Sequence, residues 1–404
     1  MKILEINKFY YLRGGSERHL FELSEALTRR GHEVVTFSMK DARNRPDASS
    51  DYFVDSVDLE KMSLKNIFKI FYNRQALHSL EKLIKQERPD IAHLHNIQYQ
   101  LTPAIIQTLK KHNIPVIQTL HAYNIICPNA KLYTEGSPCE RCSGSKFYQC
   151  LAHKCVHDSY AKSLLAMLEA YLNVSLFRRY EGVDRFIAPS RFMKEVSARC
   201  GLPEEKIHVL HNFIDSEKFF SLKSHVGDYL LYFGRLAEEK GVDMLIEAVK
   251  DLPEEKLKIV GSGPESTNYQ LRITNYKLQD RVELINHQSG KDLVNLIANA
   301  KAIIIPSRWP ENMPYSLLEA MSFGKAVVVA RIGGLPELIA HGKNGFLFTP
   351  RDPESLKEQL RILGKSDLDQ IGSEARRSII GLHAAKYCEY FEKLAIGLKK
   401  DYNS

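Results

Sequence analysis

The chain has 404 residues, of which 44% are hydrophobic and 26% charged, and a formal net charge of +7 at pH 7. This is an ordinary globular composition, and the length suggests two domains or three. No apolar run approaches the roughly 20 residues that span a bilayer, and the start MKILEINKFY is not typical of a signal peptide, so we expect a cytoplasmic protein. The mild positive charge fits a solvated basic surface, or an acidic partner such as a nucleotide phosphate, anionic lipid or nucleic acid.

Short apolar runs alternate with helical patterns along both halves of the chain. The strand candidates of the first half are residues 2–7, 33–38, 91–96, 115–121, 185–190 and 208–213, and those of the second half are YLLYFGR, KLKIVGSG, RVELINH, AIIIPS, AVVVARI and GFLFTP. This alternation predicts an α/β protein with two Rossmann-like domains, each a parallel sheet covered by helices on both faces. Residues 215–228 lack a strong period and are the predicted linker. Ligands bind beyond the carboxyl ends of such strands, so two facing domains would enclose a cleft.

Two glycines, Gly14 and Gly15, follow the first strand, and a helix is expected to open near Ser16. Glycines allow a sharp turn with bare N–H groups, and the helix N-terminus behind them favours an anion. A plain tight turn with Ser16 as N-cap explains the same residues. The dinucleotide fingerprint G-x-G-x-x-G is absent, which removes the main argument for a dehydrogenase.

Two cations, Arg235 and Lys240, flank a strand-to-helix turn in YFGRLAEEKGVDMLIEA. Cations oppose the dipole of a helix start unless an anion also binds there, and a diphosphate would supply that anion. An exposed basic pair answered by Glu238 and Glu239 is the alternative. Further on, the segment GSGP, which begins at Gly261, ends a strand with small residues that let a ligand approach the backbone.

Two carboxylates, Glu311 and Glu319, lie seven residues apart in PSRWPENMPYSLLEAM. Ser316 and Glu319 fit an S-x-x-E capping box, which would explain Glu319 but not Glu311. Glu311 precedes the predicted helix, in a loop where we expect unpaired N–H groups at Asn312, Met313 and Tyr315. One carboxylate in the loop and one in the helix could hold two distant parts of an extended polar ligand, such as sugar and ribose hydroxyls.

These motifs together resemble the retaining glycosyltransferases of family four, which have the GT-B fold. GGSE, YFGRLAEEKG, GSGP, the two spaced glutamates and GKNGFLF occur in that family's order and spacing over nearly the whole chain. The resemblance implies transfer of a sugar from a UDP- or GDP-linked donor with retained anomeric configuration and no metal at the diphosphate. It also implies an N-terminal acceptor domain (1–213, with an insert at about 123–160), a donor domain (214–382), and a last helix (383–404) that packs back on the first domain.

The resemblance assigns roles to individual residues. Arg235 and Lys240 match the diphosphate pair, Gly15 matches a glycine that approaches the phosphates, and Glu319 matches the ribose ligand. The catalytic residues are Glu311 at the donor sugar and His121 beside the reacting sugar, and front-face substitution is the expected mechanism. The expected donor-binding set is Gly15, Arg235, Lys240, Gly261, His287, Gln288, Asn312, Met313, Tyr315, Ser316 and Glu319. His287 and Gln288 stand where the family binds the base, and they do not distinguish uridine from guanosine.

The chain departs from the family pattern in one place. Much of the family has a glycine and an aromatic residue after the first glutamate, where this sequence has Asn312, Met313 and Pro314. A subset of the family shares the Glu-Asn-x-Pro form. The donor sugar therefore stays open.

Five of the seven cysteines are concentrated after His121: Cys127, Cys139, Cys142, Cys150 and Cys155. The C-x2-C pair and its neighbours suit a structural zinc on Cys139, Cys142, Cys150 and Cys155, with Cys127 as a substitute ligand. Free or redox-active thiols are the alternative, and an iron–sulfur cluster is a further one. No cofactor is expected for catalysis itself.

The segment from Lys61 to Leu80 has four basic residues and no acid, beside an apolar helical face. It could be an interfacial helix on anionic lipid, at the inner face of a membrane, or an amphipathic helix that packs on the sheet. A polyprenyl-linked acceptor in surface polysaccharide synthesis would suit the first interpretation, and a glycan acceptor suits either.

Two other classes of protein fit parts of the sequence. A GT-B sugar phosphorylase would use free phosphate without any nucleotide. A zinc-ribbon nucleic-acid-binding protein would explain the cysteines and the basic charge, but not the second domain.

Overall fold

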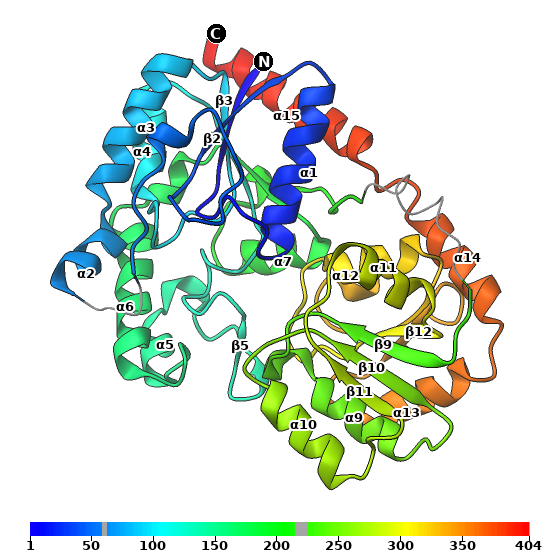
Figure 1. The fold of residues 1–404 in the computed structure, drawn as a ribbon. Helices are drawn as coiled ribbons and strands as arrows, with labels where there is room; N and C mark the ends of the chain where they lie inside the picture. The colour runs from blue at the N-terminus through cyan, green and yellow to red at the C-terminus, as the bar shows by residue number, and fades with distance from the viewer. Residues whose placement is uncertain (59–62, 215–224, 404) are drawn as a thin grey trace. The chain divides into compact units, whose positions relative to one another are not determined.

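The computed structural model describes residues 1–58, 63–214 and 225–403 (Figure 1). The chain forms two compact units. Unit 1 comprises Met1–Leu132, Glu140–Asn212 and Ala384–Ser404, and unit 2 comprises Tyr133–Cys139 and Phe213–His383. Most of the predicted linker, residues 215–224, lies outside the described residues.

Unit 1 is built on a six-stranded parallel sheet in the order β2-β1-β3-β4-β7-β8. Its strands are β1 Lys2–Ile6, β2 Glu33–Phe37, β3 Ile91–Leu94, β4 Val116–Thr119, β7 Arg185–Ala188 and β8 Ile207–Val209. The central strands β3 and β4 are buried throughout, as a sheet covered on both faces requires. Five of the six strand candidates of the first half contain a strand, and the sixth, 208–213, overlaps only the last two residues of β8.

The helices of unit 1 cover both faces of this sheet, with α3 and α4 on one side and α1 on the other (Figure 1). They are α1 Gly15–Arg29, α2 Leu64–Phe71, α3 Arg74–Glu87, α4 Ala104–Lys111, α5 Tyr148–Ala152, α6 Tyr160–Ala170, α7 Arg191–Arg199 and α15 Ala384–Asn403; α6 continues into a π-helical turn, η3 Tyr171–Leu176. The last helix, α15, returns to unit 1 and contacts α1. Arg30 at the end of α1 donates two hydrogen bonds to Glu392 of α15, at 2.6 and 2.8 Å.

Unit 2 contains the second six-stranded parallel sheet, in the order β11-β10-β9-β12-β13-β14. Its strands are β9 Tyr229–Phe233, β10 Lys256–Val260, β11 Val282–Ile285, β12 Ala302–Ile305, β13 Ala326–Ala330 and β14 Phe346–Phe348. The strand order reverses between β9 and β12, and such a switch point is where open α/β sheets bind ligands. The six strand candidates of the second half are all present.

Alternate residues of these strands enter two apolar cores, one on each face of the sheet. Leu230 and Tyr232 of β9 pack with α9, α10 and α13, whereas Leu231 and Phe233 pack with α11, α12 and α14. The helices are α9 Val242–Lys250, α10 Ser266–Asn275, α11 Gly290–Ala298, α12 Tyr315–Ser322, α13 Pro353–Leu363 and α14 Leu368–Ser378. The period of two along a strand sends successive side chains to opposite faces, which explains the division.

A short hairpin, β5 Tyr133–Thr134 and β6 Ser137–Pro138, interrupts the sequence of unit 1 and is part of unit 2. Arg351 donates a hydrogen bond to the Ser137 hydroxyl at 2.7 Å. The Tyr133 hydroxyl lies 3.4 Å from the carboxylate of Glu238. The stretch 133–139 thus departs from the predicted boundaries, because its hydrogen bonds tie it to residues of the second half.

Two alternatives considered for helix starts are wrong. Helix α1 begins at Gly15 with Gly14 as its N-cap, and Ser16 donates a hydrogen bond to the Glu17 carboxylate instead of capping the helix. Helix α12 begins at Tyr315 with Pro314 as its N-cap. Ser316 is already inside α12, so it cannot form a capping box with Glu319. Within the described part of the chain, no helix is both long and apolar enough to cross a lipid bilayer.

Candidate active site

The candidate site of unit 2 lies where β9 and β12 end, at the switch point of the sheet. The ammonium group of Lys240 is 2.6 Å from Oε1 of Glu311, and the Ser307 hydroxyl donates to the same oxygen at 2.7 Å. Glu311 is 5% exposed, so its carboxylate is held in a largely desolvated place by one cation and one hydroxyl. The two residues that the sequence placed in separate motifs therefore form one site.

The loop that carries Glu311 is held by the turn after β13. The Gly334 N–H donates to the Glu311 carbonyl at 2.7 Å. A Cβ on Gly333 would lie 2.1 Å from that carbonyl oxygen, and Gly333 has φ of 61°, so only glycine fits there. The ring of Trp309 lies 4.9 Å below the Lys240 ammonium, a cation–π contact that fixes the lysine from a third side. Ser307, Trp309 and the two glycines were not predicted as site residues.

The other predicted diphosphate ligand, Arg235, is exposed at the end of β9. Its carbonyl accepts a hydrogen bond from the Tyr232 hydroxyl at 2.8 Å, which fixes the turn. Gly261 follows the neighbouring strand β10, and its backbone packs so closely on Gly234 that a Cβ would lie 1.9 Å from the Gly234 carbonyl oxygen. At the carboxyl ends of these two adjacent strands, Gly234 and Arg235 are therefore exposed, whereas Gly261 is buried against Gly234.

The remaining predicted donor residues of unit 2 have different surroundings. His287, after β11, is exposed and Gln288 is half-buried. Asn312, Ser316 and Glu319 are also half-buried, whereas Met313 and Tyr315 are buried, and Tyr315 is part of the core under α12. The side chains of Met313 and Tyr315 therefore hold the loop in place, and only their backbone groups could meet a ligand.

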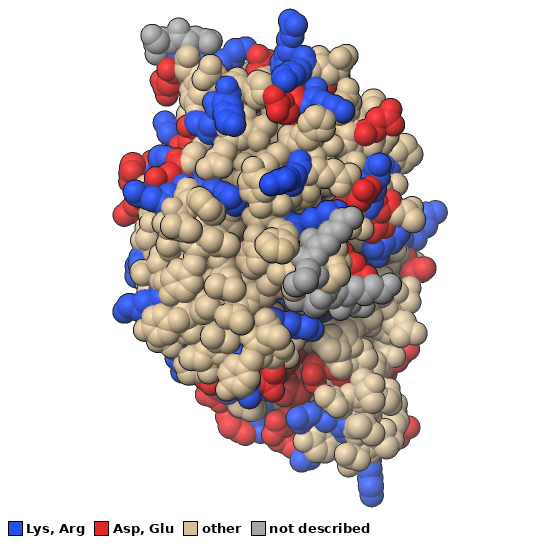
Figure 2. Space-filling view, turned by 90° about the vertical axis from the view of Figure 1, so that its left-hand side faces the viewer, with Lys and Arg blue, Asp and Glu red and all other residues tan. Residues whose placement is uncertain are grey.

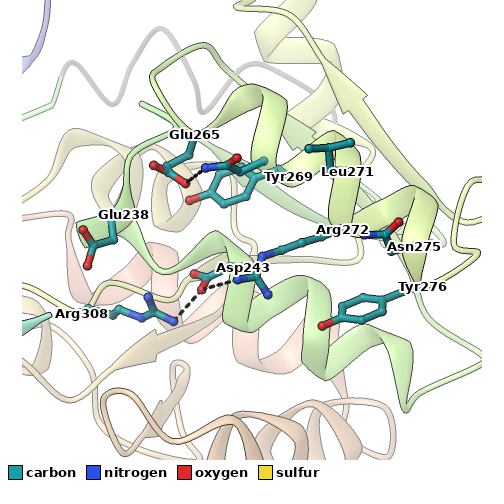
Figure 3. A pocket seen from close by; sticks show the side chains of 10 residues that line it. Glu238, Asp243, Glu265, Tyr269, Leu271, Arg272, Asn275, Tyr276 and Arg308 are labelled. Carbon is teal, nitrogen blue, oxygen red and sulfur yellow. Dashed lines mark hydrogen bonds and ion pairs between the residues drawn. The ribbon is translucent and has the colours of Figure 1, made fainter.

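A pocket of about 570 Å³ opens beside this site, between α10 and the start of α9 (Figure 3). Asp243 accepts a hydrogen bond from Arg308 at 2.8 Å and lies 4.0 Å from Arg272. The pocket is lined by Glu238, Asp243, Glu265, Asn268, Tyr269, Leu271, Arg272, Asn275, Tyr276 and Arg308. None of the predicted donor-binding residues lines it, although Glu238 and Arg308 are close in sequence to Lys240 and Glu311.

In unit 1, the predicted residues Gly15 and His121 follow β1 and β4. Gly15 is exposed at the first position of α1, where the helix N-terminus leaves N–H groups available. His121 is half-buried, and its Nε2 lies 2.8 Å from Nδ1 of His95. Nε2 of His95 is in turn 2.7 Å from the Glu5 carboxylate. His121 is therefore the outer member of a hydrogen-bonded chain.

The inner part of this chain is fully buried. The second Glu5 oxygen lies 3.1 Å from Nδ1 of His93, and Nε2 of His93 is 2.8 Å from the Thr119 hydroxyl. Glu5, His93 and His95 were not predicted as site residues. The signal was the H-x-H spacing inside the apolar strand IAHLHN, which places both imidazoles on one face, with Glu5 at the matching position of β1.

Electrostatics shift the pKa values of Glu5, His95 and His121. Burial would raise the pKa of Glu5, but His93 and His95 outweigh burial and lower that pKa to about 2. Burial lowers the pKa of His95 to about 4. Burial, together with the neighbouring imidazoles of His95 and His93, also holds the pKa of His121 well below its usual value. At neutral pH the carboxylate is ionised, and His95 and His121 are neutral.

Three of the four cysteines predicted to bind zinc lie together in unit 1. Cys142, Cys150 and the half-buried Cys155 share a small apolar cluster with Phe147, and Cys155 is hydrogen-bonded to Cys150. Cys139 is the last residue of the stretch counted with unit 2. Within the described ranges, the only three potential metal ligands with ligand atoms inside 4.8 Å of one another are Glu5, His93 and His95, which are already hydrogen-bonded together. The zinc site stays a prediction.

Comparison with known proteins identifies the class. Residues 13–218 match the family model described as Glycosyltransferase Family 4, and residues 213–379 match that described as Glycosyl transferases group 1. The chain therefore belongs to the glycosyltransferases that these models describe, and its two Rossmann-like units are those of the GT-B fold.

Three similar proteins illustrate the relationship. An uncharacterised 42.6 kDa protein in the cps region of Klebsiella pneumoniae is 26% identical over 84% of this chain and 87% of its own length. A glycogen synthase of Mycobacterium tuberculosis is 26% identical over 94% of this chain and 88% of its own. The crystal structure of Anabaena Alr3699/HepE in complex with UDP-glucose covers 98% of this chain and 100% of that one, with a TM-score of 0.69 and 18% identity.

Proposed function

We propose that the protein is a retaining glycosyltransferase that moves a sugar from a UDP- or GDP-linked donor to a glycan or lipid-linked acceptor in polysaccharide synthesis. The observation that carries the proposal is the contact of Lys240 with the buried Glu311 at the switch point of unit 2, next to the exposed Arg235. The HepE structure contains UDP-glucose, and the relatives named above include a glycogen synthase and a cps-region protein, which supports both the donor class and the polysaccharide product.

The charges of the site suit departure of a nucleoside diphosphate without a metal ion. Arg235 and Lys240 would neutralise the phosphate oxygens as the glycosidic bond breaks, the part that a divalent cation has in other enzymes. In the structure Lys240 pairs with Glu311. When the donor binds, the Lys240 ammonium would contact both the Glu311 carboxylate and the diphosphate. Glu311 would then face the developing positive charge on the sugar ring.

Retention follows if the acceptor attacks from the side that the diphosphate leaves. In this front-face route a donor phosphate oxygen accepts the proton of the acceptor hydroxyl, and no covalent sugar–enzyme intermediate forms. Glu311 stabilises the sugar by charge, and His121 of unit 1 positions a hydroxyl group. Gly15 would offer backbone N–H groups to the phosphates.

The experiment is to incubate the protein with a panel of UDP- and GDP-sugars and oligosaccharide or polyprenyl-phosphate acceptors, without added metal and with EDTA. Thermal stabilisation identifies the donor, because a ligand that binds only the folded state raises its melting temperature. NMR of the product reports the anomeric configuration. Transfer with retention in EDTA is the expected result. Inversion would contradict the mechanism, and turnover with free phosphate and no nucleotide would identify a phosphorylase instead.

We further propose that unit 1 contacts an anionic membrane. Several large apolar side chains are exposed on α2, α6 and η3, and the face that carries α2, α5 and α6 has a broad area without charged side chains (Figure 2). They are Phe68, Tyr72, Leu164, Leu168, Leu176 and Phe177, with exposed fractions of 72, 45, 42, 41, 67 and 50%. We call this set the apolar patch. Patches of this kind mark interaction surfaces.

Tyr72 and Phe177, two members of the apolar patch from different segments of the chain, both contact Arg179. Its guanidinium lies 4.7 Å from the Phe177 ring and 5.7 Å from the Tyr72 ring. In the sequence, residues 61–80 contain four basic residues and no acid, although residues 61–62 lie outside the described part of the chain, and residues 141–180 contain six basic residues and two acids. An apolar surface with a cationic flank fits anionic lipid, whereas a second copy of the chain would bring like charges together.

A further inference from the structure

The strongest unassigned feature is the chain of hydrogen bonds that runs from Glu5 through His95 to His121. It is unusual because all of its inner groups are buried, with Glu5, His93 and His95 at most 1% exposed. His121 is the half-buried member that a ligand can reach. Because buried polar groups must be satisfied, the direction of each hydrogen bond in such a chain is determined by its ends.

The inner end determines the direction. An ionised carboxylate only accepts hydrogen bonds, so Nε2 of His95 must carry the proton that Glu5 accepts at 2.7 Å. A neutral imidazole has one N–H, so Nδ1 of His95 is a bare acceptor. Nε2 of His121, 2.8 Å away, must then be the donor. The two ring planes differ by only 18°, which suits an N–H that lies in the plane of both rings.

The branch through His93 is consistent with this direction. Nδ1 of His93 also faces Glu5, at 3.1 Å, and must donate to it. Nε2 of His93 is then an acceptor, and the Thr119 hydroxyl at 2.8 Å supplies the proton. Every nitrogen of His93 and His95 thus has a partner of the right kind, and the lowered pKa of His95 supports the neutral state.

We propose that Glu5 and His95 are positioning residues that hold the proton of His121 on Nε2, so that Nδ1 of His121 accepts a hydrogen bond from a substrate hydroxyl. Among the residues that the structure describes, Nδ1 of His121 has no hydrogen-bond partner. The inference rests on the proposed function, since it assumes a sugar substrate. It restricts His121 to binding a hydroxyl group, because an unprotonated Nδ1 accepts a hydrogen bond from a hydroxyl and cannot donate one to a phosphate oxygen.

The test is the tautomer of His121 in the protein without substrate. Protein labelled with ¹⁵N-histidine is studied at pH 7 by long-range ¹H–¹⁵N correlation, and His121→Asn assigns the signal by its loss. The expected result is a neutral His121 with the proton on Nε2. A proton on Nδ1, or a doubly protonated ring, would overturn the proposal. The tautomer itself is read from wild-type protein, and His121→Asn serves only to assign the signal.

Two matched variants then test the hydrogen-bonded chain Glu5–His95–His121, which we call the relay. Glu5→Met removes the acceptor at the inner end, so His121 should become a mixture of tautomers. Thr119→Val removes the bonds of Thr119 to His93 and to Tyr387 but leaves the path from Glu5 through His95 to His121 intact, so His121 should keep its proton on Nε2. The relay is wrong if both variants behave alike.

Kinetics separate this inference from the proposed function. Glu5→Met should lower kcat/KM roughly 10- to 100-fold, the effect typical of partners that orient a functional histidine, with an unchanged Kd for UDP or GDP. A tautomer change without any transferase activity in wild-type protein would refute the proposed function and leave the relay intact. Transferase activity that Glu5→Met leaves unchanged would refute the relay alone.

Discussion

The ammonium group of Lys240 lies 2.6 Å from Oε1 of Glu311, although 71 residues separate them in the sequence. The contact joins the turn after β9 to the loop after β12, the two strands that flank the switch point of unit 2. A buried carboxylate beside a cation is retained at a cost in desolvation. Such a pair is typical of a site where positive and negative charges develop on a substrate, and the first two predictions concern its two members.

Glu311→Gln should reduce kcat by roughly 10²- to 10³-fold, the range for loss of one preorganised electrostatic group. The amide has the same shape and keeps a bond to Ser307, so the fold should be preserved. Steady-state kinetics and the melting temperature are the measurements. The control is Ser307→Ala. It removes the hydroxyl that donates to the same Glu311 oxygen but changes no charge, so its effect on kcat should be much smaller. Near-normal turnover by Glu311→Gln would remove Glu311 from the mechanism.

Lys240→Ala should weaken binding of UDP or GDP by roughly 10- to 100-fold, because charge-assisted hydrogen bonds contribute about 1.5–3 kcal/mol. Isothermal titration calorimetry measures the Kd. The matched control is Lys258→Ala on β10, which removes a lysine that pairs with Glu283 at 3.3 Å. Equal Kd values for the two variants would contradict the diphosphate contact.

Gly261→Ala should destabilise unit 2 by roughly 1–3 kcal/mol or more, since φ at this position is +153° and the new Cβ would lie 1.9 Å from the Gly234 carbonyl oxygen. Chemical denaturation gives the free energy of unfolding. Gly397→Ala is the opposite case: the residue is exposed in α15, and no heavy atom lies within 4 Å of a Cβ there. That change should stabilise by about 0.5–1 kcal/mol. A neutral Gly261→Ala would show that β9 and β10 end further apart.

Glu169→Gln should stabilise the protein at pH 8 but not at pH 4. Burial raises the pKa of Glu169 to about 7, although Arg179 and Lys8 oppose the shift. The folded carboxyl thus keeps its proton up to about pH 7, whereas the unfolded one loses it near its ordinary pKa. Wild-type stability therefore falls as the pH rises through this window, by at most about 3 kcal/mol, and the glutamine variant escapes this loss.

The measurement for Glu169 is the free energy of unfolding at several pH values. The control is Glu195→Gln, which changes an exposed glutamate of α7 and should give a flat difference between variant and wild type. A Glu169→Gln difference that is equally flat would show that the pKa of Glu169 in the folded protein equals its value in the unfolded chain, and would contradict the raised pKa.

Removing two members of the apolar patch, by Phe68→Ser with Leu176→Ser, should weaken binding to anionic vesicles by at least roughly tenfold. A fully buried apolar side chain contributes about 1.5–3 kcal/mol. Co-sedimentation with phosphatidylcholine vesicles, with and without phosphatidylglycerol, measures binding. Leu271→Ser removes an exposed leucine of unit 2, with an exposed fraction of 55%, and should not change vesicle binding. The membrane proposal would be wrong if wild-type protein did not bind vesicles. If it formed concentration-dependent dimers that the double substitution abolished, the apolar patch would be an interface with a second copy of the chain.

The sequence by itself determined the two sheets and two central residues of the candidate site. Eleven of the twelve predicted apolar runs contain a strand and the twelfth, 208–213, overlaps one, because burial on both faces of a parallel sheet demands continuous apolar residues, and that demand is visible locally. Lys240 and Glu311 could be chosen because each stands at a strand's carboxyl end, where chemistry concentrates.

Only the tertiary structure decided which distant groups meet. Glu5 and His93 are aligned because β1 pairs with β3, 88 residues further along, and no local pattern reports that register. The hairpin 133–139 joined unit 2 through hydrogen bonds to Glu238 and Arg351. Ser316 met a capping pattern but lies inside α12, since the helix start was set by Pro314 and by burial of Tyr315. Local propensity is weak beside such packing, so contacts of this kind follow from the fold and not from the motif.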